Sequence, residues 1–113
     1  MKNVRKAVEA YLQDYPPALK LFQELMDVGK VYLIGGVLRE YRDNNTIKEL
    51  RDADFIVEVQ HDDLWHKMLE KYQPKGNHFD GYKFNCEKGF LVDVWEMGKT
   101  WAYQQELGMI LNA

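Results

Sequence analysis

Up to Gly29, hydrophobic residues recur every three or four positions, which is the spacing of one helix face. A first helix is expected over residues 3–14. Pro16 and Pro17 break it and can open a second helix, because proline is tolerated in a first helical turn. Gly29 is a plausible stop for that second helix. The apolar positions are Val4, Val8, Tyr11 and Tyr15 in the first helix and Leu21, Phe22, Leu25 and Val28 in the second.

Beyond Gly29, short apolar runs bounded by glycine or polar residues predict strands that alternate with helices. The loop Pro74–Asn77 precedes a predicted hairpin. The expected elements are a strand at Val31–Ile34, a helix from Val37 to Tyr41, a strand at Ala53–Val59, a helix from His61–Asp63 through Tyr72 with Leu64, Met68 and Leu69 facing inward, hairpin arms at Phe79–Asn85 and Phe90–Trp95, and a helical or irregular segment from Thr100 to Leu111. This order predicts an α+β (α/β-like) fold, with a small mixed β-sheet flanked by helices.

Composition agrees with one domain over residues 1–113, with 46% hydrophobic and 29% charged residues. The formal charge of −3 means that an RNA or DNA partner would need a local basic patch. Cys86 is the only cysteine, so no intrachain disulfide is expected. No apolar run approaches the roughly 18–20 residues that cross a membrane, and the N-terminus is not typical of a secretion signal. We therefore expect a cytoplasmic protein without a membrane partner.

Two acids, Asp52 and Asp54, stand one residue apart where the strand Ala53–Val59 begins. Side chains at positions i and i+2 of a strand project from the same face, about 7 Å apart at the Cα atoms. Ala53 and Phe55 then point to the other face, toward a core. Two like charges side by side need a proton, a basic side chain or a metal ion to neutralise them. On its own, such a pair most often caps an element or faces water.

A third acid, Asp93, lies between Val92 and Val94 in the last predicted strand, where aspartate is a poor strand former. If this strand lies beside Ala53–Val59, Asp52, Asp54 and Asp93 converge. Three carboxylates suit hard cations such as Mg²⁺ or Mn²⁺. With a nucleoside triphosphate present, such a cluster can hold two metal ions.

Gly35 and Gly36 lie between a predicted strand and a predicted helix. Glycines let the backbone turn sharply and approach a ligand, and a helix N-terminus offers free N–H groups to phosphates. Arg39, one turn into the helix, can bind the phosphates or pair with an acid. A Gly-Gly pair alone is weak evidence, and the Gly-x-x-x-x-Gly-Lys loop is absent.

Lys83 lies on the strand expected to pair with that of Asp93, which allows a phosphate contact. His61 and His66 are five positions apart, on different faces of a helix, so a zinc site is not expected. Cys86 is interpreted as a bystander thiol. Aromatic residues such as Trp95 can stack on a base, although core packing is their more frequent use.

These pieces, in this order, resemble the nucleotidyltransferase superfamily that includes DNA polymerase β and the CCA-adding and poly(A) polymerases. Leu33-Ile-Gly-Gly-Val-Leu-Arg-Glu40 looks like the CCA-adding version of the glycine motif, with Glu40 where aspartate is usual. Arg51-Asp-Ala-Asp-Phe55 matches the Asp-x-Asp motif, and Val92-Asp-Val94 matches the third acid. The similarity covers roughly residues 30–96.

The resemblance implies a metal-dependent transfer of a nucleoside monophosphate from a triphosphate such as ATP to an acceptor, with release of pyrophosphate. Asp52 and Asp54 would hold Mg²⁺ or Mn²⁺, with Asp93 as a third ligand that also helps to activate the acceptor hydroxyl. Gly35 and Gly36 would hold the phosphates.

The acceptor stays open between a small molecule, RNA and a protein, because the chain has no room for the RNA-gripping domains of the larger enzymes. A homodimer, a partner subunit or a longer chain would each complete the cleft. Two other readings are also open. One is an inactive relative that binds a nucleotide or a protein partner as a regulator, and the other is an interaction domain whose acids face water.

Overall fold

The computed structural model describes residues 4–50, 53–77, 80–87, 89–98 and 109–110. The described helices are α1 (Val4–Leu12), α2 (Pro16–Val28), α3 (Gly36–Asn44) and α4 (Asp62–Tyr72). The described strands are β1 (Gly29–Ile34), β2 (Ala53–Val59), β3 (Lys75–Gly76), β4 (Tyr82–Glu87), β5 (Phe90–Glu96) and β6 (Met109–Ile110). The chain is therefore an α+β protein with a mixed sheet, as the hydrophobic pattern predicts.

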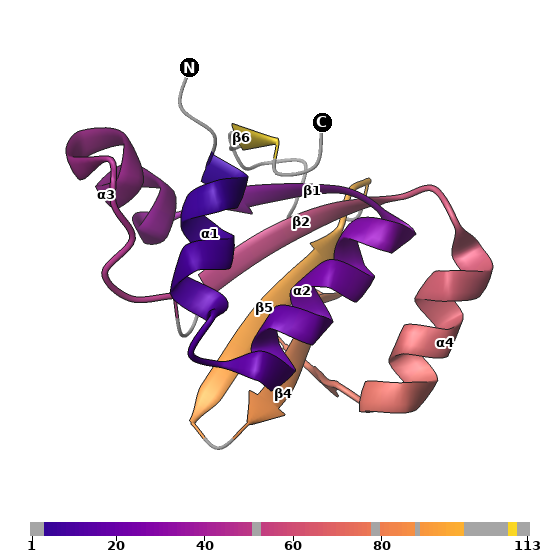
Figure 1. Ribbon diagram of the computed structural model, residues 1–113. Coiled ribbons are helices and arrows are strands. Elements are labelled where there is room, and N and C mark those ends of the chain that lie inside the picture. The colour runs from indigo at the N-terminus through magenta and orange to yellow at the C-terminus, as the bar shows by residue number, and fades with distance from the viewer. Residues whose placement is uncertain (1–3, 51–52, 78–79, 88, 99–108, 111–113) are drawn as a thin grey trace.

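The strands form one six-stranded sheet in the order β3-β4-β5-β2-β1-β6 (Figure 1). β2 and β5 are parallel neighbours, and the other neighbouring pairs are antiparallel. A parallel pair needs a long crossover between its strands. Here α4, β3 and β4 lie on that crossover, and they bring β5 back beside β2.

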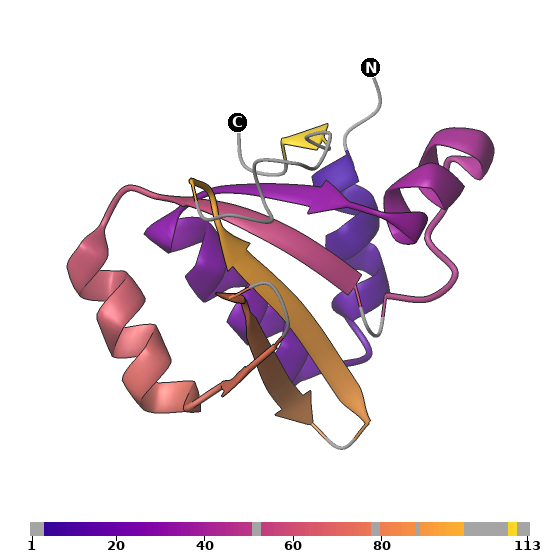
Figure 2. The same cartoon turned by 180° about the vertical axis from the view of Figure 1, so that it is seen from behind.

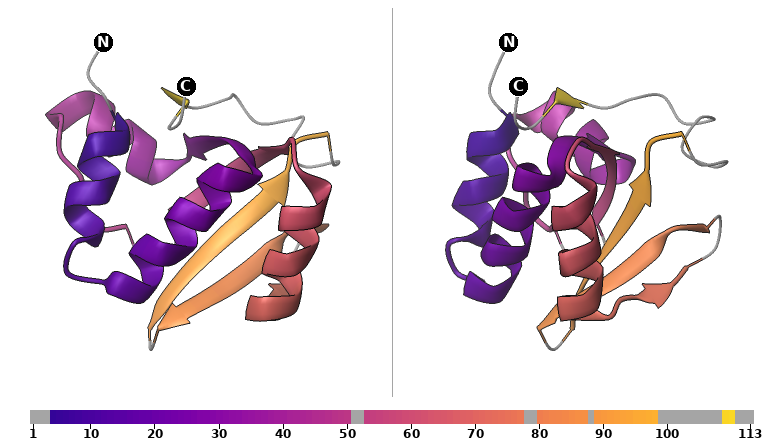
Figure 3. Two further views of the ribbon diagram at one scale, coloured as in Figure 1. Left: turned by 45° about the vertical axis from the view of Figure 1, so that its right-hand side comes forward. Right: turned by 90° about the vertical axis from the view of Figure 1, so that its right-hand side faces the viewer.

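One face of the sheet is covered by α1 and α2, with α4 packed beside α2 and α3 at the end where β1 stops (Figures 1 and 3). Seen from behind, β1, β2 and β5 have no described helix in front of them (Figure 2). The inward stripe of α2 is the predicted one, and it packs with alternate residues of β2 and β5. The buried residues of this core include Leu21, Phe22, Leu25, Val28, Ala53, Phe55, Val92 and Val94.

The opposite sheet face carries a second, smaller cluster. Its buried members are Tyr32, Ile34, Ile56 and Trp95, with Met97 packed against them. Because successive strand residues alternate between the two faces, the strands of the sheet centre are apolar on both. A charged side chain on this second face therefore lies among apolar neighbours.

Three details differ from the predicted pattern. In α4 the inward positions are Trp65 and Met68, whereas Leu64 is 37% exposed. The Trp65 ring packs against Tyr82 and Phe84 of β4 and takes the inward place expected of Leu64. Met68 and the partly buried Leu69 face the core as predicted. Lys75–Gly76, expected in a loop, pairs with β4 as β3.

The predicted helical or irregular segment from Thr100 to Leu111 lies outside the described residues, except for Met109 and Ile110. These two residues pair with Tyr32 and Leu33 of β1 as a strand, so the prediction is wrong for them.

Candidate functional site

Asp54 and Asp93 are direct register partners on the parallel strands β2 and β5. The same row continues to Ile34 of β1 on one side and to Lys83 of β4 on the other. Register partners on neighbouring strands project from the same face, with backbones about 5 Å apart. The two carboxylates therefore lie side by side on the face away from α1 and α2.

The alternation of β2 and β5 explains why both acids point this way. Ala53, Phe55 and Val92 are buried in the core under the helices. Asp54 and Asp93 then take the other face, where Asp54 is partly exposed and Asp93 is 9% exposed. The sequence correctly predicts that Asp54 points opposite to Ala53 and Phe55. Asp52 lies outside the described residues.

Asp93 has two partners from the β3–β4 side of the sheet. The Lys83 ammonium Nζ lies 3.4 Å from Oδ1 and 3.4 Å from Oδ2. Asn77 donates a hydrogen bond from its Nδ2 to Asp93 Oδ1 at 3.0 Å. Lys83 was predicted to bind phosphate, and in this structure its ammonium lies at the acid. The spacing in the sequence gives no signal for Asn77, because it stands in a predicted loop and meets Asp93 only through the pairing of β4 with β5.

Gly35 lies directly against Asp54. Its φ of 81° and ψ of −154° belong to a region that residues with a side chain rarely adopt. A Cβ at this position would come within 3.2 Å of Asp54 Oδ2. Gly35 thus makes the predicted sharp turn, and its backbone lies close to a carboxylate of the same chain, whereas the predicted approach to a ligand stays a prediction.

The helix α3 begins at Gly36, immediately after this turn, with Gly35 as its N-cap. The N–H groups of a first helical turn have no partner within the helix, and they carry the positive end of the helix dipole. The Arg39 N–H donates to Gly35 O at 3.2 Å, and a Cβ on Gly36 would lie 3.7 Å from Arg39 Nη2. The exposed Arg39 guanidinium therefore lies beside the glycine turn, where the sequence predicts an anion-binding group.

Of the predicted site residues, the fold gathers Gly35, Gly36, Arg39, Asp54, Asp93 and Lys83 at one end of β1 and β2 and on the adjoining row of β5 and β4. The two described carboxylates offer the hard oxygen ligands that Mg²⁺ and Mn²⁺ prefer, so the donor set fits such an ion. Among the described residues, no group of three or more His, Cys, Asp and Glu is placed to hold a metal ion. The predicted set of three includes Asp52, which lies outside the described residues.

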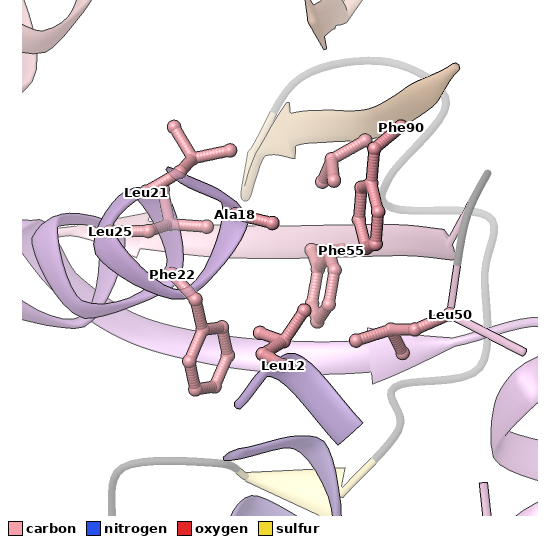
Figure 4. Close-up of a pocket in the computed structure, with 9 residues that line it drawn as sticks. Leu12, Ala18, Leu21, Phe22, Leu25, Leu50, Phe55 and Phe90 are labelled. Atoms are coloured by element: carbon pink, nitrogen blue, oxygen red, sulfur yellow. The ribbon is translucent and has the colours of Figure 1, made fainter. Parts of the chain in front are cut away.

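The apolar core under α2 contains a void of about 10 Å³ (Figure 4). Leu12 of α1, Phe22 of α2 and Phe55 of β2 are among the side chains around it. A space this small and apolar is a packing defect and holds no substrate.

A larger, open recess of about 460 Å³ lies at the edge of the sheet beside Asn77. It adjoins Asp93 through Asn77, which also lines it. The recess is lined by Gly76, Asn77, Asp80, Gly81, Tyr82 and Glu96.

Three further residues considered from the sequence, Cys86, His61 and His66, lie elsewhere. Burial raises the pKa of the Cys86 thiol to about 12, with a smaller contribution from the charge of Glu87. A thiol that stays protonated is a poor nucleophile, which supports its interpretation as a bystander. His61 precedes α4 and His66 lies on its exposed side.

No protein-family model, no curated protein and no solved structure matches this chain. No helix within the described part of the chain is long and apolar enough to cross a membrane.

Proposed function

We propose that this protein is a metal-dependent nucleotidyltransferase, which moves a nucleoside monophosphate from a nucleoside triphosphate to an acceptor hydroxyl. The observation that carries the proposal is the paired position of Asp54 and Asp93, with Gly35 and the N-terminus of α3 against Asp54. A helix N-terminus can bind phosphates and the two carboxylates can bind a cation, so together they offer partners to a metal-bound triphosphate.

The residues have distinct tasks in this proposal. The backbone N–H groups at Gly36 and the guanidinium of Arg39 bind the triphosphate. Asp52, Asp54 and Asp93 hold Mg²⁺ or Mn²⁺, which when bound supplies the positive charge that phosphoryl transfer requires.

Asp93 also accepts the proton of the acceptor hydroxyl. The acceptor oxygen forms a bond to the α-phosphorus, the bond to the bridging oxygen breaks, and pyrophosphate leaves. The proton passes from Asp93 to water.

The acceptor enters, in this proposal, from the recess beside Asn77. A recess of about 460 Å³ matches the volume of pockets that hold small molecules. The described residues that line it include neither Asp54 nor Asp93, so the acceptor stays open between a small hydroxyl compound, RNA and a protein. We place the activity in the cytoplasm.

One observation favours a second candidate function. The Lys83 ammonium lies beside both oxygens of Asp93, so its positive charge can neutralise this acid without a metal ion. A regulator that binds a nucleotide, or a protein partner, without catalysis would be stable with this ion pair intact. In that case Lys83 would be part of a permanent structural pair.

Calorimetric titration tests the proposal directly. ATP, GTP, CTP and UTP are each titrated into the protein with Mg²⁺ and again with excess EDTA. We expect binding of at least one triphosphate that requires Mg²⁺. Absence of metal-dependent binding for all four would overturn the proposal.

The triphosphate that binds is then supplied with an α-phosphate label to panels of small hydroxyl compounds, RNA and proteins. Transfer of the label to an acceptor supports the enzyme. Metal-dependent binding without transfer to any panel supports the regulator.

A further inference from the structure

Among the residues that the structure describes, Asn77 is an uncharged side-chain partner of Asp93, and its contact distinguishes the two carboxylate oxygens. Asn77 Nδ2 lies 3.0 Å from Oδ1, whereas Lys83 Nζ lies 3.4 Å from both oxygens. The lysine therefore neutralises the carboxylate without selecting either oxygen. Asn77 selects one, since its hydrogen bond occupies Oδ1 and leaves Oδ2 with the long lysine contact.

Contacts hold both the backbone of Asn77 and its amide nitrogen, whereas its buried Oδ1 has no hydrogen-bond partner among the described residues. Its backbone N–H donates to Gly81 O at 3.0 Å, and its Nδ2 also lies 3.5 Å from Tyr82 O. Both oxygens that face Nδ2 are acceptors, so the amide presents its NH₂ end to Asp93 and no flipped orientation satisfies them.

Gly81 provides the space for this arrangement. A Cβ on Gly81 would lie 2.6 Å from Asn77 Oδ1 and 2.4 Å from the Trp95 ring. A side chain there would push the amide out of its place. The glycine and the asparagine thus form one rigid support under the carboxylate.

We propose that Asn77 is a positioning residue for Asp93, which holds Oδ1 and presents Oδ2 to the metal ion and the acceptor hydroxyl. This inference rests on the proposed function. A neutral donor suits this task because it orients the carboxylate without the positive charge that would compete with a cation. Residues that hydrogen-bond a metal ligand in this way set its rotamer, and their removal weakens metal binding about 10- to 100-fold.

The test measures Mn²⁺ binding to the folded protein by the loss of the free-ion signal in electron paramagnetic resonance, in the presence of each of ATP, GTP, CTP and UTP. A titration of each triphosphate without protein is subtracted, because the triphosphate itself binds Mn²⁺. We expect Asn77→Ala to weaken Mn²⁺ binding about tenfold or more. Asn85→Ala, on the exposed face of the same sheet edge, is the matched control and leaves the affinity unchanged. Thermal unfolding of both variants shows that each is folded.

A double-mutant cycle separates positioning from a general structural effect. If Asn77 acts through Asp93, Asn77→Ala adds no further loss of Mn²⁺ affinity to Asp93→Asn. A loss that is the same in both backgrounds overturns the inference, as does an Asn77→Ala variant that binds Mn²⁺ like the wild type. If the wild-type protein binds no Mn²⁺ with any triphosphate, the proposed function itself fails, and this result is distinct from the other two.

Discussion

Gly35 and Asp54 are in contact range across the antiparallel pair of β1 and β2, at the point where β1 gives way to α3. A Cβ on Gly35 would lie 3.2 Å from Asp54 Oδ2, so the backbone of the glycine turn lies directly over the carboxylate. This contact unites the two motifs that the sequence presents separately. The glycine turn and the acid pair therefore adjoin each other in the fold.

The first prediction concerns this glycine. Gly35→Ala should destabilise the fold by about 1–3 kcal/mol, because alanine is strained at this backbone conformation, and it should also weaken triphosphate binding by pressing on Asp54. Gly89→Ala is the matched control, since Gly89 has a φ of 77° and no atom within 4 Å of the added Cβ. Gly89→Ala should lower the free energy of unfolding without changing the triphosphate affinity. Urea unfolding measures the free energy of unfolding, and calorimetry measures the triphosphate affinity. Equal triphosphate affinities for the two folded variants would contradict a triphosphate site at Gly35.

The second prediction concerns the acid pair. Asp54→Asn removes one negative charge and keeps the shape of the side chain, so the fold should persist with a melting temperature within a few degrees of wild type. Mg²⁺-dependent triphosphate binding should fall by more than about 100-fold, beyond the effect of residues that only orient a ligand. Asp14→Asn, on an exposed turn, is the control. An Asp54→Asn variant that binds the triphosphate with wild-type Mg²⁺ dependence and affinity would remove the basis of the proposed function.

The third prediction concerns Lys83, whose ammonium competes with a cation for Asp93. Lys83→Met should strengthen Mn²⁺ binding in the absence of nucleotide by up to about fivefold, in line with the modest strength of a partly exposed ion pair. The same substitution should weaken binding of the triphosphate, because the site loses the positive charge of the Lys83 ammonium. Lys75→Met, opposite Lys83 on β3 and exposed, should change neither quantity. The regulator reading instead expects Lys83→Met to lower the melting temperature without strengthening Mn²⁺ binding.

The fourth prediction is a pH dependence of stability at the junction of α2 and α4. Partial burial would raise the pKa of Glu24, but hydrogen bonds from Tyr72 (2.6 Å) and Lys71 (3.0 Å) outweigh it and lower the pKa below 4.5. A carboxylate with a lowered pKa in the folded state stabilises the fold above its unfolded-state pKa. That contribution is lost as the pH falls through the folded-state pKa.

Glu24→Gln should therefore cost about 1 kcal/mol at pH 7, since the pair is partly exposed. The difference from wild type should shrink as the pH is lowered below about 4.5. Urea unfolding across this range measures it, with the exposed Glu70→Gln on α4 as the control. A difference that is independent of pH would show that the loss is due to packing and not to the charge.

The fifth prediction concerns Cys86. Because burial raises the pKa of its thiol to about 12, an aromatic disulfide reagent should modify the folded protein slowly at pH 8 and the urea-unfolded protein at once. The ratio of the two rates should follow the free energy of unfolding. Fast modification of the folded protein would mean that the thiol is accessible and ionised.

The hydrophobic pattern predicts the fold well where one residue type dominates a face. The stripe of α2 and the alternation around Asp54 are both confirmed, because buried apolar positions leave little freedom in register. In α4 the prediction is right for Met68 and Leu69 and wrong for Leu64, whose inward place Trp65 takes. A short helix with apolar residues on two adjacent rows has no single stripe, and contact of Trp65 with Tyr82 decides between them.

The site is only partly predictable for a different reason. Gly35, Asp54 and Asp93 stand out because each is unusual for its local element. Asn77 is an ordinary loop residue, and its contact with Asp93 depends on how β3, β4 and β5 pair. Long-range pairing of this kind leaves no mark in the spacing of a single sequence.

The parallel pairing of β2 with β5 has a consequence for how the protein reaches its native state. Asp54 and Asp93 meet only after the chain has passed through α4, β3 and β4, so their contact has a high sequence separation and its loop closure is costly. In a chain whose β5 is missing or not yet paired with β2, Asp54 and Asp93 do not form a pair. A ligand that bridges the two carboxylates would join segments that associate late, and it should therefore slow unfolding more than it speeds folding.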